Sequence, residues 1–221
     1  MSKLALIVLS SIISLSAGSA WAEGNQITSE SEALRLFTQC DASFFNALKE
    51  NQKLFLSSVE VKNRGNAATI AVANPLSEKG REQVFKEPIE INGLRLIAWR
   101  DEVSYDVKMG GFLFWGFKAE GDPKTVAKKI NAFLPELGKL QNVGDSWVRP
   151  EIRMIGDPLD AWRPNRGSGG TVTPKGSVER VLLLESEAAG QTSIFCTLQG
   201  SITPPLIQTL RPDLTSTEYP Q

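Results

Sequence analysis

The sequence predicts an α+β fold, in which an antiparallel meander sheet carries helices packed on one face. Three observations lead to this prediction: helical spacing of apolar residues near the N-terminus, period-two alternation from residue 56 to 118, and a second hairpin followed by a helix near the C-terminus. Blocks of strands and blocks of helices, rather than strict alternation, are typical of this class. A chain of 221 residues is also long enough to bury a sizeable core.

Residues 27–55 are predicted to form the first helix. The stretch Ser29-Glu30-Ser31-Glu32 has the pattern of a capping box, in which Glu32 reaches back to the N-cap. Cys40 lies on the same stripe as the apolar residues that follow at helical spacing, and we therefore expect it to face the core. That stripe consists of Leu34, Phe37, Phe44, Phe45 and Leu48.

Period-two alternation then predicts about five antiparallel strands. A turn signal at 63–66 separates the first two, which lie around Val59–Val61 and 67–73. Asn92-Gly93 between two alternating runs is a strong hairpin signal, because a type I′ turn needs two positive φ angles. We expect the run 94–100 to pair with 111–118 across a loop at 101–110.

A second helix is predicted at 123–135, with Asp122 as the N-cap and Pro123 at the first helical position. The C-terminal third repeats this order: strands at 178–184 and 191–198 precede a short helix that begins at Thr203-Pro204. A shift of 81 residues aligns the two units, which indicates a tandem repeat of a hairpin plus a helix. Shared cap chemistry at strand-to-helix junctions is the alternative explanation.

Between these units, residues 147–155 predict a strand that contains Pro150, and 157–176 predicts a long irregular loop. We favour a mobile linker over a binding loop for that stretch. The chain then divides into four segments: a signal peptide at 1–22, a helix–sheet–helix unit at 23–137, a partly irregular connecting segment at 138–177, and a second hairpin-plus-helix unit at 178–221 packed into the same domain.

The N-terminus has the three parts of a secretory signal peptide: Lys3, an apolar run from Leu4 to Leu15, and a small-x-small site ending at Ala22. The apolar run is shorter than the roughly 20 residues that a membrane span needs. We therefore expect cleavage after Ala22 and no membrane insertion after signal removal. A periplasmic location is favoured, with secretion as the alternative. The net charge of −1 argues against a nucleic-acid binder.

Cys40 and Cys196 are the two cysteines of the chain. In an oxidising compartment, an even pair is most simply one disulfide, and two buried free thiols are the alternative. Zinc binding is disfavoured, because two thiols without histidine cannot complete a tetrahedral site.

The absence of histidine excludes Ser-His-Asp and Cys-His catalysis and histidine-ligated metals. No phosphate-binding glycine loop, dinucleotide fingerprint or nucleophile elbow occurs either. We therefore expect no cofactor and no metal. Carboxylate chemistry remains open, and its candidates are Asp101, Glu102, Asp106, Asp157 and Asp160.

The candidate binding residues are aromatic and basic. Trp162, Arg163 and Arg166 form a patch in the long loop, and tryptophan and arginine commonly anchor binding surfaces. Trp115 lies on a strand whose opposite face carries Phe112 and Phe114, so both faces of that strand need a cover: helices and the long loop, which we favour, or a second layer or a partner on one side.

These observations favour an exported, non-enzymatic protein of a bacterial envelope that acts by binding. The partner is then an unknown envelope protein or a small ligand. Two alternatives stay open: a carboxylate-dependent hydrolase of an envelope glycan, and an accessory subunit of a secretion or surface assembly. A hydrolase requires that several of the five carboxylates converge in one pocket, whereas a docking subunit requires an uncovered apolar face.

Overall fold

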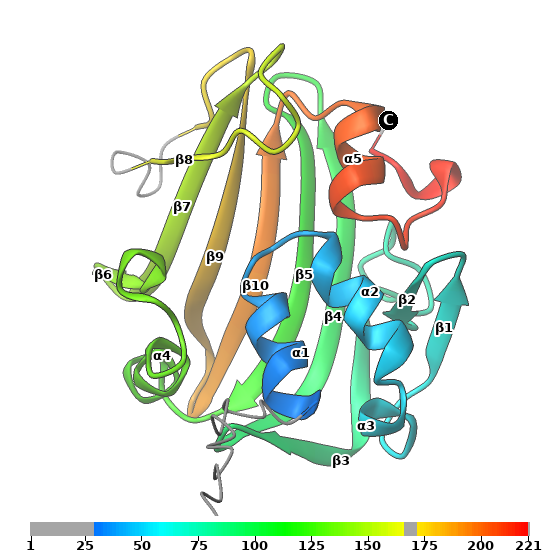
Figure 1. Cartoon of the computed structure of the whole chain (residues 1–221), viewed down its shortest axis with the longest axis vertical. Coiled ribbons are helices and arrows are strands. Elements are labelled where there is room, and N and C mark those ends of the chain that lie inside the picture. Colours follow the sequence, from blue (N-terminus) through cyan, green and yellow to red (C-terminus); the bar gives the residue numbers. More distant parts are fainter. Residues whose placement is uncertain (1–28, 166–171, 221) are drawn as a thin grey trace, which may run out of the picture.

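The computed structural model describes residues 29–165 and 172–220, and a large antiparallel sheet dominates this part of the chain (Figure 1). Eight strands form the large sheet in the order β3-β4-β5-β10-β9-β7-β6, with β8 paired to β7, and two further strands form a small sheet. The mixed class with a mostly antiparallel sheet is confirmed. The strands are β1 (Val61–Arg64), β2 (Ala67–Ile70), β3 (Glu82–Ile91), β4 (Leu94–Asp106), β5 (Gly110–Glu120), β6 (Gln141–Val143), β7 (Ser146–Met154), β8 (Arg163–Pro164), β9 (Ser177–Ala188) and β10 (Gln191–Gly200).

The hairpin predicted at Asn92-Gly93 joins β3 to β4, and both residues have positive φ, 50° and 72°. The loop predicted at 101–110 is wrong. Strand β4 continues to Asp106 and pairs with β5 down to Gly110, because the alternation of buried residues continues through Val103. The side chain of Asp106 then caps the short turn by accepting hydrogen bonds from the backbone amides of Lys108 and Met109, at 2.8 and 2.9 Å.

The first predicted strands form a separate two-stranded sheet, so the single meander of about five strands is wrong at this point. Strand β2 buries Ala67, Ala68 and Ile70, and α2 packs against it. The chain then turns at Asn74 and Gly80, which share a backbone hydrogen bond of 2.9 Å, before it enters β3.

The helices are α1 (Ser29–Phe37), α2 (Ala42–Glu50), α3 (Lys53–Leu56), α4 (Pro123–Asn131) and α5 (Pro204–Leu210), with short 3₁₀ turns η1 (Glu136–Gly138) and η2 (Ser216–Glu218). The single helix predicted at 27–55 is therefore wrong. Cys40 has a φ of 55°, which interrupts the helix, and Asp41 caps α2 by accepting a hydrogen bond from the Ser43 amide at 2.8 Å. The carboxylate of Glu32 pairs with Arg35. The predicted cap of α4 by Asp122, with Pro123 next, is confirmed.

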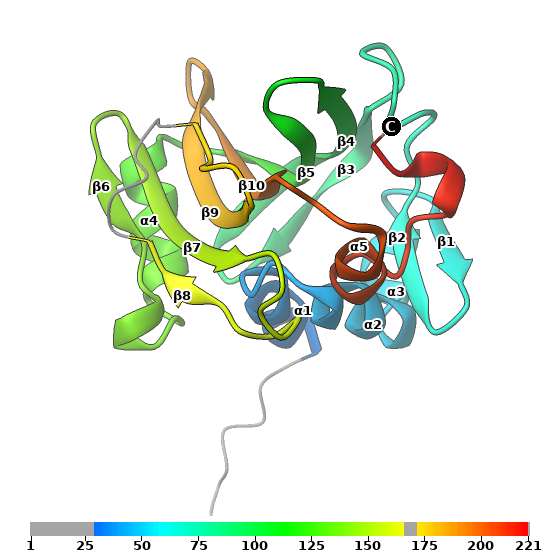
Figure 2. The same cartoon turned by 90° about the horizontal axis from the view of Figure 1, so that it is seen from above.

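The core lies on the face of the large sheet that we call the inner face. Helices α1, α2 and α5 lie on this side (Figure 2), and α4 contributes Val126, Ala127 and Ile130 to the same core. At its centre, aromatic rings from α1, α2, β4 and β5 contact one another edge to face or stacked, with centroids 4.8–6.3 Å apart. These rings belong to Phe37, Phe44, Trp99 and Phe117.

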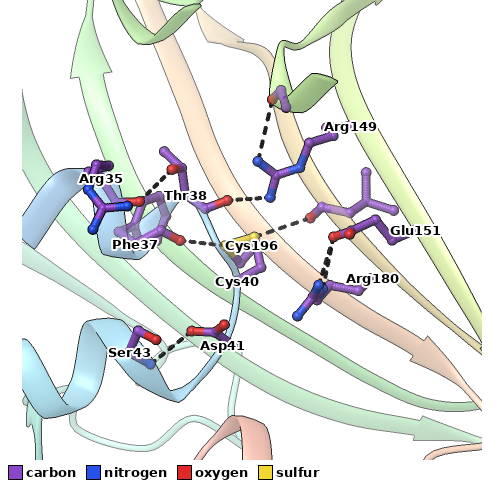
Figure 3. Close-up of a disulfide and its surroundings, with 12 residues drawn as sticks. Arg35, Phe37, Thr38, Cys40, Asp41, Ser43, Arg149, Glu151, Arg180 and Cys196 are labelled. Carbon is purple, nitrogen blue, oxygen red and sulfur yellow. Dashed lines mark hydrogen bonds and ion pairs between the residues drawn. A yellow bond between two sulfur atoms is a disulfide. The ribbon is translucent and has the colours of Figure 1, made fainter. Parts of the chain in front are cut away.

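The predicted disulfide between Cys40 and Cys196 is confirmed, with Cα atoms 5.2 Å apart. It joins the turn between α1 and α2 to the inner face of β10 (Figure 3). Beside it, Arg149 of β7 donates a hydrogen bond to the carbonyl oxygen of Thr38. The turn between α1 and α2 is thus attached to the sheet by a covalent bond and by a hydrogen bond from a charged group.

The connecting segment is more ordered than expected. The strand predicted at 147–155 is β7, and β8 lies within the stretch that we predicted to lack regular structure. Pro150 lies between the part of β7 that pairs with β6 and the part that pairs with β8, where its missing N–H costs no ladder bond. The predicted signal peptide and its cleavage site lie outside the described residues.

Candidate functional site

The candidate site lies on the second face of the large sheet, which we call the outer face. Because side chains alternate along a strand, β9 sends Leu182 and Leu184 into the core and turns Val181 and Leu183 to the outer face. The two leucines of the inner face are fully buried, whereas Val181 and Leu183 are half-buried. The neighbouring strands extend this apolar surface with Phe112, Phe114, Phe195, Val148 and Pro150.

A cavity of about 450 Å³ opens on this face, and we call it the outer-face cavity. Strands β5, β10, β9 and β7 supply its floor, and the β6–β7 turn at Val143, Gly144 and Ser146 supplies one wall. Half-buried apolar side chains make up much of the lining, and its two ionisable residues are Glu179 and Glu185. This volume lies within the range of small-molecule sites.

Glu179 of β9 is 2% exposed, so its carboxylate lies among protein atoms. The amides of Asn165 and Gln199 donate hydrogen bonds to it at 2.8 and 2.7 Å, and the Thr173 hydroxyl lies 3.5 Å away. All three donors are neutral. Among the residues that the structure describes, no lysine or arginine forms an ion pair with Glu179.

Glu185 lies further along β9, toward the other end of the cavity. Burial raises the pKa of its carboxyl above the ordinary value, the charge of Glu187 raises it further, and Arg100 opposes both. A cation bound beside this carboxyl would favour its charged form and so oppose this shift.

Elsewhere on the outer face, basic and acidic side chains form ion pairs with one another. Lys118 of β5 contacts Glu82 at 2.6 Å and Glu187 at 2.8 Å, and Arg100 contacts Glu102 at 2.6 Å. Arg100 also lies over the ring of Phe195, 5.8 Å from its centroid. Lys118 and Arg100 are thus engaged in ion pairs with carboxylates that do not line the outer-face cavity, whereas the described donors to Glu179 are neutral.

A second cavity of about 270 Å³ adjoins the first and shares Val143, Val148 and Pro150 with it. Its lining carries charges of both signs, and Glu136 pairs there with Lys139. Burial lowers the pKa of Arg149 in this lining. Mixed signs give this cavity no charge preference of its own.

The predicted binding residue Trp115 is fully buried in the core. Its ring stacks on the guanidinium of Arg211, 4.8 Å from the ring centroid, and Phe45 covers the same group at 4.7 Å. Arg211 in turn donates hydrogen bonds to Asp101 at 2.7 Å and to Asp213 at 2.9 Å. Complete burial removes Trp115 from the surfaces that a partner can reach.

Trp162 and Arg163 lie beside β7, and both contact other side chains of the same protein. The guanidinium of Arg180 lies 4.5 Å from the Trp162 ring centroid and that of Arg153 lies 6.0 Å away, while Arg163 contacts Asp157 at 3.2 Å. Trp162 therefore helps to cover the inner face next to β7 and β9. The third residue of the predicted patch, Arg166, lies outside the described residues.

The five candidate carboxylates do not converge. Asp101 and Glu102 are neighbours on β4, so the strand turns them to opposite faces, and each pairs with different arginines. Asp106 caps the β4–β5 turn, and Asp157 caps the turn after β7 by accepting a hydrogen bond from Met154 at 2.9 Å. None of the cavities described above is lined by two of the five.

Sequence reasoning missed Glu179 and Glu185. A signal for them existed, because both are acidic residues that flank the apolar run Val181–Leu184 within one strand, where a charge needs a specific environment. Which face they occupy, and which donors meet them, required the register of β9 against β10 and β7.

Comparisons with protein-family models, with curated proteins and with solved structures found no significant match to this chain. Across residues 29–165 and 172–220, no helix is both long enough and apolar enough to cross a membrane. The same described residues contain no group of three or more side chains placed to hold a metal ion.

Proposed function

We propose that this protein is an exported protein of a bacterial envelope that acts by binding a ligand or partner on the outer face of its sheet. The outer-face cavity carries this proposal. It places half-buried apolar side chains and two carboxylates on a face away from α1, α2 and α5 (Figure 2). A surface of this composition is typical of a recognition site.

Export is the second part of the proposal. The N-terminal sequence has the pattern of a signal peptide, and the Cys40–Cys196 disulfide is compatible with an oxidising compartment. We propose the periplasm as the location, with secretion as the alternative. Fractionation followed by N-terminal sequencing tests this: the proposal expects an exported chain that begins at Glu23, and a cytoplasmic chain that retains Lys3 would contradict it.

The distance between the two carboxylates of the outer-face cavity favours binding over hydrolysis. Glu179 and Glu185 are separated by six residues along one strand, which corresponds to roughly 20 Å. Acid and base carboxylates of glycoside hydrolases lie no more than about 9.5 Å apart. The two carboxylates of the outer-face cavity therefore suit recognition rather than a shared proton transfer.

A thermal-shift screen with a chemically diverse library tests the binding site. Val181→Arg places a long charged side chain across the floor of the outer-face cavity. The matched control is Val107→Arg, at a position that is 84% exposed in the β4–β5 turn. Compounds that raise Tm in wild type and in the control are expected to lose this effect in Val181→Arg. Equal shifts in all three proteins would show that the ligand binds elsewhere.

We further propose that the helices pack on one face because the fold is a tandem repeat of a hairpin plus a helix. The shift of 81 residues pairs Trp115 with Cys196, and these residues lie opposite each other near the middle of the β5–β10 ladder. Strands β4 and β9 flank that pair, and α4 and α5 each begin with a proline after a cap position. Two equivalent units related by a local two-fold axis would produce this arrangement.

A further inference from the structure

We infer that the outer-face cavity binds an organic cation with an apolar body, and that its cationic group lies against Glu179. This inference rests on the proposed function, because it names the class of ligand for the same site. It is carried by the sign of the charges in the lining, by the burial of one carboxylate, and by the apolar floor between the two carboxylates.

The charges in the lining have one sign. Both ionisable residues in the lining of the outer-face cavity, Glu179 and Glu185, are acidic, and among the described residues no lysine or arginine lines it. On the outer face, Arg100 pairs with Glu102, and Lys118 pairs with Glu82 and Glu187. An anionic ligand would therefore add a like charge to two carboxylates, whereas a cation would complement both.

Of the two carboxylates, Glu179 is better placed to bind the cationic group of the ligand. A carboxylate that is 2% exposed has lost nearly all of its hydration, and its described partners are two amides and a distant hydroxyl. Two carboxylate oxygens offer about four acceptor positions, so the three described donors leave one for a ligand N–H. A charge-assisted hydrogen bond there is about twice as strong as a neutral one.

The floor explains why the cation should carry an apolar body. Val181 and Leu183 lie between Glu179 and Glu185 on β9, and Phe114 of β5 lines the same cavity. These side chains are half-buried, so a hydrocarbon that covers them removes more apolar area from water. A small inorganic cation would use the carboxylates and leave this surface exposed.

Calorimetric titration with three ligands of equal chain length tests the inference. n-Octylammonium, 1-octanol and octanoate share an unbranched eight-carbon skeleton and carry a cationic, a neutral and an anionic head group. Wild-type protein is expected to bind n-octylammonium at least tenfold more tightly than 1-octanol, and to bind octanoate most weakly. This comparison needs no variant, so it does not depend on the folding of a mutant.

Two matched variants then locate the head group. Glu179→Gln keeps the shape of the side chain and removes its charge, and we expect it to weaken n-octylammonium binding about tenfold with little effect on 1-octanol. Glu185→Gln makes the same change at the more exposed carboxyl, and we expect a smaller loss. Circular dichroism confirms that both variants fold.

The outcomes separate the two proposals. Similar affinities for the three ligands, abolished together by Val181→Arg, would overturn the cation inference and leave binding on the outer face intact. An unchanged n-octylammonium affinity in Glu179→Gln, or the absence of saturable binding by all three ligands, would also overturn it. Failure of the proposed function would appear separately, in the library screen. There, compounds would raise the Tm of Val181→Arg as much as they raise that of wild type.

Discussion

Arg211 shows how this fold accommodates a fully buried charge. Its guanidinium lies between the rings of Phe45 and Trp115 and donates hydrogen bonds to Asp101 and Asp213. One cation with two carboxylates leaves an excess negative charge in the core. Burial raises the pKa of Asp101 to about 6, and the charge of Asp213 adds to this, although Arg211 opposes both.

This shift predicts how stability depends on pH. Asp101 titrates near its ordinary value in the unfolded chain and near 6 in the folded one, so the folded state holds the proton more tightly. The contribution of Asp101 to the free energy of unfolding is therefore fully present below about pH 4. It decreases as the pH rises through 6, by at most about 3 kcal/mol.

Asp101→Asn tests this prediction. The amide keeps an acceptor for Arg211 and leaves a neutral pair of Arg211 with Asp213. We expect the stability of wild type relative to this variant to decrease between pH 4 and pH 7, as measured by urea unfolding. A difference that does not change with pH would contradict the assignment.

Removing the positive charge of Arg211 is expected to lower the free energy of unfolding by more than the Asp101→Asn substitution changes it. Arg211→Met leaves two buried carboxylates without their partner, and we expect it to lower the free energy of unfolding by about 3–5 kcal/mol at pH 7. The same urea unfolding measurement checks this prediction. A loss below about 1 kcal/mol would mean that water or another group compensates the carboxylates.

At the scale of elements, the pairing of β5 with β10 depends on Gly116. A Cβ atom at this position would lie 2.0 Å from the backbone carbonyl oxygen of Ile194, which cannot move without disturbing the ladder. The same ladder holds Cys196 opposite Trp115. Close approach of the two backbones at Gly116 is thus part of what positions the disulfide.

Gly116→Ala is expected to lower the free energy of unfolding by at least about 3 kcal/mol, since backbone atoms must shift. Gly190→Ala is the matched control, because Gly190 has a φ of 75° and a Cβ atom added there would meet no other atom within 4 Å. We expect the control to cost only about 1–2 kcal/mol, from its left-handed conformation. Equal losses in thermal unfolding would argue against the close contact.

At the scale of the whole molecule, the disulfide joins two layers that are far apart in sequence. Cys40 and Cys196 are separated by 156 residues, so the cross-link restricts most of the unfolded chain. Chain entropy alone gives a stabilisation of roughly 5 kcal/mol for a loop of this length, and native strain reduces such values in practice. The helical layer should therefore be the first part to loosen on reduction.

Replacing both cysteines by alanine is expected to lower the free energy of unfolding by about 2–5 kcal/mol in urea. Reduced wild type serves as the control and should unfold at nearly the same urea concentration as the double variant. If oxidised and reduced wild type unfold together, the cross-link contributes nothing to stability.

Local signals account for the parts of the fold that could be predicted. Asn92-Gly93 and Asp122-Pro123 fix their turn and cap through their own backbone preferences, and the predicted structure is present at both. Local spacing places Cys40 in one continuous helix, because its neighbours keep helical spacing on both sides of it. The helix is interrupted at Cys40, which has a positive φ and forms a disulfide with Cys196 of β10, a residue that is distant in sequence.

The candidate site was less accessible to prediction. Alternation along 178–184 indicates a strand, and composition indicates a cysteine pair, but neither shows which side of β9 a helix covers. Trp115 and Phe114 are adjacent on one strand and equally aromatic in local context. The first is buried against Arg211 and the second lines the outer-face cavity, and this difference arises from the layer above each face.

By itself, the sequence determined the strand and helix types of this protein, its principal turns and its cysteine pair, because these depend on residues that are close in the chain or few in number. Only the tertiary structure decided that Glu179 and Glu185 share a cavity and that Asp101 and Arg211 meet in the core. These contacts depend on strand order and register. Their strength depends on burial, which is established only after distant segments have packed together.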